Sequence, residues 1–171
     1  MDGVRIRDEL RPGDLGEVAR LHGRLYAAEY DLDASFEAYV ARSVAECVEA
    51  GWPGRGGEGL WVAENGGGHV LGHVALTREG PGEARLRWFL LTPEARGHGV
   101  GRRLLDALLR VADAAGHERI TLTTFSELEA AAHLYRATGF ERVSASPLTQ
   151  WGRTITMEVY ERRRPAGERS S

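Results

Sequence analysis

The residues best suited to chemistry form a short loop in the second half of the chain. Gly97, Gly99 and Gly101 occupy alternate positions between Arg96 and Arg102, directly before a leucine-rich segment. Glycine is unfavourable inside helices and strands, so this junction must require bare backbone. The free N–H groups and partial positive charge of a helix N-terminus bind anions, and arginine guanidinium groups add donors. The spacing therefore predicts a site for a phosphate or diphosphate.

Two familiar phosphate-binding loops do not fit this spelling. A Walker loop ends in Gly-Lys-Ser/Thr, and residues 96–102 contain no lysine. A dinucleotide-binding fingerprint has the spacing G-x-G-x-x-G after the first strand of its unit. Here Arg102 stands where the third glycine would be, and the loop comes late in the chain.

The loop instead resembles the Arg/Gln-x-x-Gly-x-Gly/Ala loop of the GNAT acetyltransferase superfamily. Residues 89–109 (FLLTPEARGHGVGRRLLDALL) are similar to the strand, loop and helix of that family's core, and residues 133–143 (HLYRATGFERV) to its second core motif. Together these motifs cover roughly the C-terminal half of the chain. Residues 22–40 and the Trp-Gly pair at 151–152 resemble the acetyltransferase half of certain MarR-type regulator fusions.

The resemblance implies acetyl-CoA as co-substrate, with no metal ion. The pantetheine arm would lie like an extra strand between residues 87–91 and 120–125. A strand bulge would direct the backbone amide of about Leu91 at the thioester oxygen, and Tyr135 would be the general acid, unless it merely packs. The side chain of His98 is expected to point away from the phosphates. The residues expected to contact the cofactor are Leu90, Leu91, Arg96, Gly97, His98, Gly99, Val100, Gly101, Arg102, Thr124, Ser126 and Tyr135.

One residue departs from the family pattern. Leu128 occupies the position, seven residues before Tyr135, where the family often has an asparagine that contacts the cofactor arm. We expect that contact to be lost, or to be supplied by Ser126 or Thr124.

The sequence says less about the acceptor site than about the cofactor site, and no motif identifies a general base. His22, Tyr26 and Glu29 lie near the end of the first expected helix, where related enzymes often build the acceptor site. His22 is expected to titrate near neutrality, unless it is simply a half-exposed polar residue of the helix. His73 faces either the cleft or solvent.

Composition limits the classes of function. The chain has 171 residues, a net charge of −3, a pI of about 6.1 and one cysteine, Cys47. These values give no reason to expect nucleic-acid binding, and no apolar run is long enough to span a membrane. We expect a cytoplasmic protein. The family resemblance implies a small-molecule or peptide amine as acceptor and is compatible with a homodimer. The mild acidity favours a cationic amine. The alternative is a module that binds acyl-CoA as a sensor without turnover.

These residues need a scaffold, and the pattern predicts one. The expected order of elements is β-α-α-β-β-β-α-β-α-β-β, with Asp14, Asp33 and Ser126 as helix caps. Residues 86–93 become apolar on both faces, which is typical of a central strand. The fold class is α+β: a GNAT-like mixed, mostly antiparallel sheet with helices on both faces and a cleft for acyl-CoA between splayed strands. One domain is expected over residues 1–161, followed by a flexible tail at 162–171.

Overall fold

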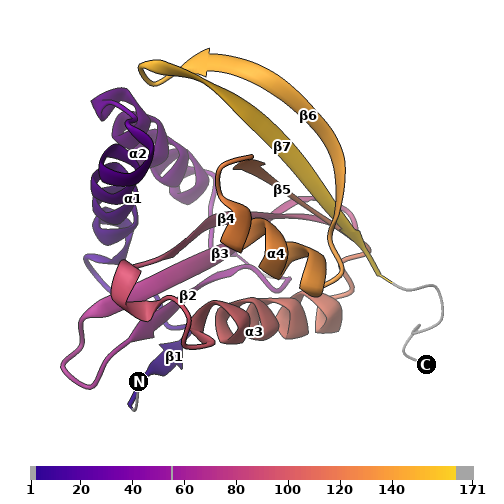
Figure 1. The fold of residues 1–171 in the computed structure, drawn as a ribbon. Helices are drawn as coiled ribbons and strands as arrows, with labels where there is room; N and C mark the ends of the chain where they lie inside the picture. Colours follow the sequence, from indigo (N-terminus) through magenta and orange to yellow (C-terminus); the bar gives the residue numbers. More distant parts are fainter. Residues whose placement is uncertain (1–2, 55, 165–171) are drawn as a thin grey trace.

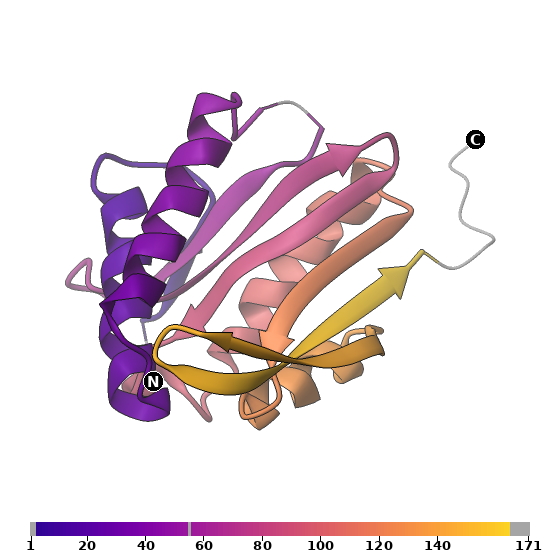
Figure 2. The same ribbon diagram turned by 90° about the horizontal axis from the view of Figure 1, so that it is seen from above.

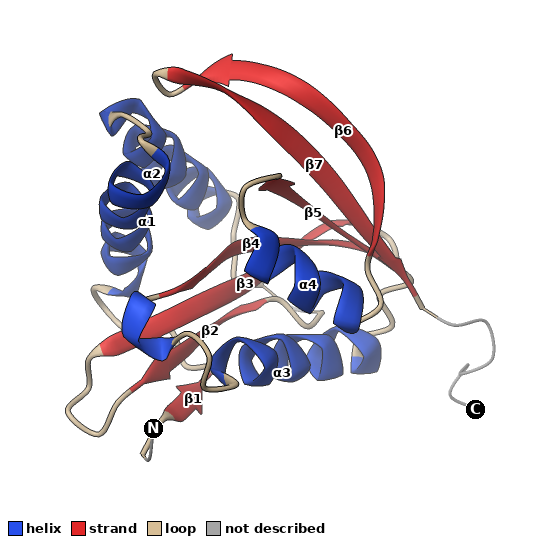
Figure 3. Cartoon of the chain, in the orientation of Figure 1, coloured by secondary structure: helices blue, strands red, loops and turns tan. Residues whose placement is uncertain are grey.

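A seven-stranded mixed sheet forms the centre of the molecule (Figure 1, Figure 3). The computed structural model describes residues 3–54 and 56–164. The strands are β1 (Arg5–Arg7), β2 (Gly59–Glu64), β3 (Val70–Gly80), β4 (Glu83–Leu91), β5 (Arg119–Phe125), β6 (Glu141–Gln150) and β7 (Arg153–Arg163). Their spatial order is β1-β2-β3-β4-β5-β7-β6, so β4 is central, as its apolar faces predicted.

The pairing of β4 with β5 is the one parallel contact in the sheet, and it is short. Only Glu83 to Arg85 of β4 pair with Arg119 to Thr121 of β5. Beyond these residues β4 continues to Leu91 and β5 to Phe125, but the two strands no longer pair with each other. The strands β6 and β7 curve away from the rest of the sheet (Figure 1). The expected splayed cleft is therefore present.

Helices cover both faces of the sheet (Figure 2). They are α1 (Asp14–Tyr30), α2 (Ala34–Glu49), α3 (Val100–Ala114) and α4 (Glu129–Ala137), with a 3-10 turn, η1, at Pro93–Ala95. Leu104, Leu105 and Leu108 of α3 are completely buried in the core that α3 and α4 share with one face of the sheet. Phe36, Val40 and Val44 of α2 join a second core on the opposite face. The predicted element order and fold class are thus confirmed.

The helix starts follow the sequence only in part. Asp33 caps α2 by accepting a hydrogen bond from the backbone of Ser35, as predicted. Asp14, however, is the first residue inside α1 and binds Arg7, while Gly13 takes the cap position. The helix α4 begins only at Glu129 and has no side-chain cap, so the prediction for Ser126 is wrong.

The C-terminal boundary also differs from the prediction. Arg162 and Arg163, expected in a flexible tail, are the last residues of β7. Arg162 forms a bidentate ion pair with Asp113 of α3 at 2.8 and 2.9 Å, which explains why the strand extends beyond residue 161. Residues 165–171 lie outside the described part of the chain. Within that part, no helix combines the length and apolar character needed to cross a bilayer.

A buried ion network joins the first strand to the first helix. Arg7 of β1 is 7% exposed and contacts Asp14 of α1 at 2.7 Å and Glu64 of β2 at 2.9 Å. The hydrogen bond from Arg7 lowers the pKa of Glu64 and keeps this carboxylate charged. Arg7 therefore bridges two buried carboxylates and holds α1 against the sheet edge, and Arg11, 3.7 Å from Glu64, adds a second positive charge.

Removing the Arg7 cation should cost more than removing an exposed one. In Arg7→Met, the buried Asp14 loses its ion-pair partner and the buried Glu64 keeps only Arg11 at 3.7 Å, so we expect the free energy of unfolding to fall by about 3–5 kcal/mol in urea titrations. The matched control is Arg20→Met, which breaks an exposed pair with Glu17 and should cost less than about 1 kcal/mol. Equal losses in the two variants would contradict a buried network.

Candidate active site

The glycine loop lies between the end of β4 and the start of α3. Gly97 and Gly99 both have a φ of 74°, a left-handed conformation that favours glycine. A Cβ added at either residue would meet no described atom within 4 Å. Bare backbone therefore borders open space at the N-terminus of α3, where free N–H groups favour an anion. This geometry fits the diphosphate of a coenzyme.

Gly101 serves a different purpose from the other two glycines. A Cβ at Gly101 would lie 2.9 Å from Leu91 Cδ1 and 3.0 Å from Leu134 Cδ1. The residue is buried on the first turn of α3. It therefore allows α3 to approach β4 and α4 closely. Gly101 therefore has a packing role in addition to its predicted place at the anion site, since it also lines the groove described next.

A groove of about 710 Å³ runs from this loop along β4 to α4. The residues that line it include these from the expected cofactor site: Leu90, Leu91, Arg96, Gly97, Gly99, Val100, Gly101 and Arg102. The other lining residues are Leu25, Tyr26, Glu29, Tyr30, Phe89, Ala95, Glu127, Leu128, Glu129, Ala130, Ala131, His133 and Leu134. Most residues expected at the cofactor site therefore share one groove. The exposed side chain of His98 does not line it, as expected.

The two arginines of the loop already have partners. Arg96 pairs with both carboxylate oxygens of Glu29 at 2.9 Å and donates to the carbonyl of Leu91 at 3.1 and 3.2 Å. Arg102 contacts Asp106 at 2.8 Å, one turn further along α3. Glu29, expected on the acceptor side, thus joins α1 to the glycine loop.

A bulge interrupts β4 just before the groove. Trp88 has a φ of 48°, and the register with β3 shifts between His73 and Ala75. The amide of Thr92 donates to Leu71 of β3 at 2.9 Å. Because amide direction alternates in an antiparallel pair, the amide of Leu91 faces away from β3, toward the gap before β5.

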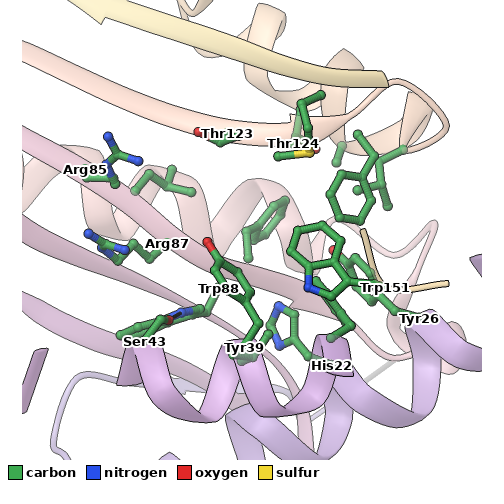
Figure 4. Close-up of a pocket in the computed structure, with 18 of the residues that line it drawn as sticks. His22, Tyr26, Tyr39, Ser43, Arg85, Arg87, Trp88, Thr123, Thr124 and Trp151 are labelled. Carbon is green, nitrogen blue, oxygen red and sulfur yellow. Dashed lines mark hydrogen bonds between the residues drawn. The ribbon is translucent and has the colours of Figure 1, made fainter. Parts of the chain in front are cut away.

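A second cavity, of about 180 Å³, lies on the other side of this gap (Figure 4). Its walls come from α1, α2, α4, β4, β5, β7, the turn before α4 and the turn between β6 and β7. Tyr26, Phe89, Leu128 and Ala131 line both this cavity and the groove. These four shared residues mark the place where the two spaces meet.

Tyr135 lies at this meeting place. The residue is 4% exposed and lines the second cavity, with its ring 5.8 Å from that of Phe89. Burial raises the pKa of its hydroxyl well above the usual value, so the group keeps its proton. Among the described residues, this hydroxyl has no hydrogen-bond partner. It is a free donor inside the site.

His22 and His73 form a buried pair, with ring centroids 5.3 Å apart. The Nδ1 atom of His22 lies 2.9 Å from the carbonyl of Val18, and that of His73 lies 2.6 Å from the carbonyl of Trp88. Burial and the neighbouring His73 lower the pKa of His22 to about 3, and burial lowers the pKa of His73 to about 4. The expectation that His22 titrates near neutrality is wrong, because the ring is buried.

The neutral rings therefore present lone pairs on Nε2. Each Nδ1 must carry the proton, because it faces a carbonyl oxygen, so each Nε2 is an acceptor. His22 lines the second cavity, whereas Nε2 of His73 is buried behind it and without a partner among the described atoms. His73 faces neither the cavity nor solvent.

Two further predicted residues have different positions. Thr124 is buried and lines the second cavity. Ser126 is exposed in the turn after β5 and lines neither space. Leu128, at the family's asparagine position, lines both.

Sequence reasoning missed several side chains in the second cavity. Arg85 and Arg87 line it, as do Tyr39 of α2 and Trp88 of β4 (Figure 4). Trp88 donates from Nε1 to the hydroxyl of Ser43 at 2.9 Å. The alternation of Arg85 and Arg87 along a strand was the available signal, because residues i and i+2 share a face.

Comparison with known proteins decides the family. The model of the acetyltransferase (GNAT) family matches residues 24–140. The chain belongs to this family. It is 31% identical over 145 residues to the mycothiol acetyltransferase of Thermobifida fusca, a match that covers 85% of this chain and 42% of that protein. It is 32% identical over 113 residues to the N-alpha-acetyltransferase RimI of Mycobacterium tuberculosis, covering 64% and 68% of the two chains.

Solved structures share the GNAT fold. A putative acetyltransferase from Salmonella typhimurium, solved with its cofactor acetyl-CoA, superposes with a TM-score of 0.75 at 16% identity and covers 99% of both chains. The chain spans 35% and 42% of the length of two of the curated relatives it matches. The finer likeness to MarR-type regulator fusions receives no support from these relatives. Among residues 3–54 and 56–164, no group of three His, Cys, Asp or Glu side chains could hold a metal ion.

The buried histidines should make stability depend on pH. When the protein unfolds, both histidines regain a pKa near 6.5, so below this pH the unfolded chain binds more protons than the folded one. We expect the free energy of unfolding to fall between about pH 7 and pH 5, by up to about 1.4 kcal/mol per pH unit for each histidine.

Urea titrations across this range would measure the slope. His22→Phe, which keeps an aromatic ring beside Tyr26, should make the slope shallower. The exposed His98→Gln should leave it unchanged. A slope that is the same in all three proteins would show that His22 is not buried in its neutral form.

Proposed function

We propose that this chain transfers the acetyl group of acetyl-CoA to a primary amine by direct attack. The observation that carries the proposal is the junction of the groove and the second cavity at Tyr26, Phe89, Leu128 and Ala131. A donor that extends from the glycine loop along the groove would bring its acetyl group to this junction. An acceptor in the second cavity would reach the same point from the opposite side.

The donor would be held mainly by backbone groups. Gly97, Gly99 and the first turn of α3 offer N–H groups to the diphosphate. The free edge of β4 offers the amide of Leu91 to the pantetheine arm, as a strand would. Arg96 and Arg102 stand beside the loop and supply positive charge. These features support acetyl-CoA as the co-substrate.

The reaction needs a hydrogen-bond donor for the thioester oxygen and a proton donor for the leaving sulfur. The amine nitrogen attacks the thioester carbonyl carbon, the carbon–sulfur bond breaks, and the amine loses a proton. The backbone amide of Phe89, a residue that lines both spaces beside the bulge, would stabilise the oxygen as it gains negative charge. The expected donor, Leu91, is further from the second cavity, since it lines only the groove. Tyr135 would protonate the leaving sulfur.

His22 would position the amine and would not hold its proton. Because burial lowers the pKa of His22 to about 3, the ring cannot remain protonated at neutral pH. Its Nε2 can still accept a hydrogen bond from the neutral amine. The proton that the amine loses would then pass to water in the cavity.

Two expectations remain predictions. One is a cytoplasmic location, which the single, half-buried Cys47 favours. The other is a homodimer, which gel filtration with light scattering would detect.

The diphosphate site can be tested with a charge at Gly99. Asp and Asn both tolerate the left-handed backbone of this position and have nearly the same size. We expect Gly99→Asp to bind acetyl-CoA at least tenfold more weakly than Gly99→Asn in calorimetry, because only Asp repels the diphosphate. Equal affinities in the two variants would place the diphosphate elsewhere.

The acid role of Tyr135 can be separated from its packing. Tyr135→Phe keeps the ring that packs near Phe89 and Phe140 but removes the hydroxyl. We expect kcat to fall by about 10²- to 10⁴-fold while the affinity for acetyl-CoA is unchanged. The assay measures released thiol with a panel of amines. An unaltered kcat would leave Tyr135 with a packing role, and binding without thiol release by the unmodified protein would favour the sensor.

A further inference from the structure

We propose that the acceptor amine carries an anionic group, such as a carboxylate, that Arg85 and Arg87 bind at the end of the second cavity away from the acetyl group. This inference rests on the proposed acetyl transfer and names the substrate class of that site. It replaces the expectation, drawn from the net charge of the chain, of a purely cationic acceptor.

The position of the two arginines sets the shape of the acceptor. Both lie on β4 and line the second cavity, and their side chains share one face of the strand (Figure 4). At roughly 3.3 Å per residue, Arg87 and Arg85 lie about 7 and 13 Å along the strand from Phe89. An amine at Phe89 would therefore need its anionic group several bonds away, further than in an α-amino acid.

Arg85 and Arg87 are the charged side chains among the described residues that line the second cavity. No aspartate or glutamate is among the described residues that line the second cavity. Glu79 of β3 is shared by both arginines, at 3.1 Å from Arg87 and 3.7 Å from Arg85. Glu79 is thus the described carboxylate that pairs with both guanidinium groups, and Glu46 and Glu58 line a neighbouring pocket beside Arg87.

Arg85 has the less satisfied side chain of the two. Its Nε atom is buried and has no hydrogen-bond partner among the described atoms. The neighbouring strands do not supply one. Arg85 pairs with Thr121 of β5, which in turn pairs with Glu161 of β7. Glu161, however, already forms ion pairs with Arg119 and Arg163 at 2.7 and 2.6 Å. A bound carboxylate would satisfy this donor.

The part of the cavity between the amine and the arginines is aromatic. Trp151 packs 5.1 Å from both Phe36 and Tyr39, and Trp88 lines the cavity at the bulge of β4. Such surfaces favour a flat, apolar body. The cavity, of about 180 Å³, also favours a small molecule. The acceptor is thus an amine joined through an apolar body to an anion.

Matched probes test the anionic group directly. We would compare 4-(aminomethyl)benzoate and 4-aminobutanoate, each with its own methyl ester. Binding is followed by the fluorescence of Trp88 and Trp151 in the presence of CoA, and turnover by thiol release with acetyl-CoA. We expect at least one acid to bind about tenfold to a hundredfold more tightly than its ester, as for hydrogen bonds to charged groups.

Variants then assign the preference to the arginines. Arg85→Gln combined with Arg87→Gln should remove the preference for the acid and leave the affinity for the ester unchanged. Glu79→Gln, outside the cavity, frees both arginines and should tighten binding of the acid but not of the ester. The control Arg110→Gln removes an exposed arginine on α3 and should change neither.

The two readouts separate this inference from the proposed function. Turnover of the amines without any preference for the acids in the unmodified protein would overturn the inference and support acetyl transfer. Preferential binding of an acid that the double variant abolishes, without thiol release, would support the arginine site and contradict acetyl transfer. Equal binding of both acids and their esters, or an unchanged preference in the double variant, would overturn the inference.

Discussion

The whole site depends on how early β4 and β5 stop pairing. Three residues of each strand are in register, and the remainder of β4 has backbone groups that face a gap. Such groups are costly when they have no partner, so a gap of this kind is stable only if water or a ligand fills it. The groove and the second cavity meet at this gap, where residues of α1 and α4 line both spaces.

The two halves of the site use different physical means. At the glycine loop, fixed backbone dipoles and left-handed residues favour a diphosphate, and side-chain charge is secondary because Arg96 and Arg102 already have carboxylate partners. In the second cavity, aromatic rings and guanidinium groups provide most of the surface. Tyr135 and the amide of Phe89 lie between the halves. In the proposed function, donor recognition is thus mainly a property of the backbone, and acceptor recognition a property of side chains.

The sequence predicted the parts that depend on local pattern. These parts are the amphipathic leucine pattern of α3, the end of β4 that is apolar on both faces, and the residue types and spacing of the glycine loop. Each of them reflects a rule that acts within a few residues. Features that depend on distant partners were not predictable in this way. Asp14 binds Arg7 and does not cap α1, and Gly101 leaves room for Leu134 of α4. His22 is buried because α2 packs against α1 at this point. The cavity that contains Arg85 and Arg87 exists only after β5 and the turn at Trp151 are in place.

The four residues that line both spaces also divide the protein into parts that can and cannot change independently. A substitution at Tyr26, Phe89, Leu128 or Ala131 alters the walls of donor and acceptor sites at once. Arg85, Tyr39 and Trp151 touch only the acceptor cavity. New acceptor preferences can therefore arise by mutation at these outer positions without loss of the shared donor, which is a physical route by which one fold diversifies its chemistry.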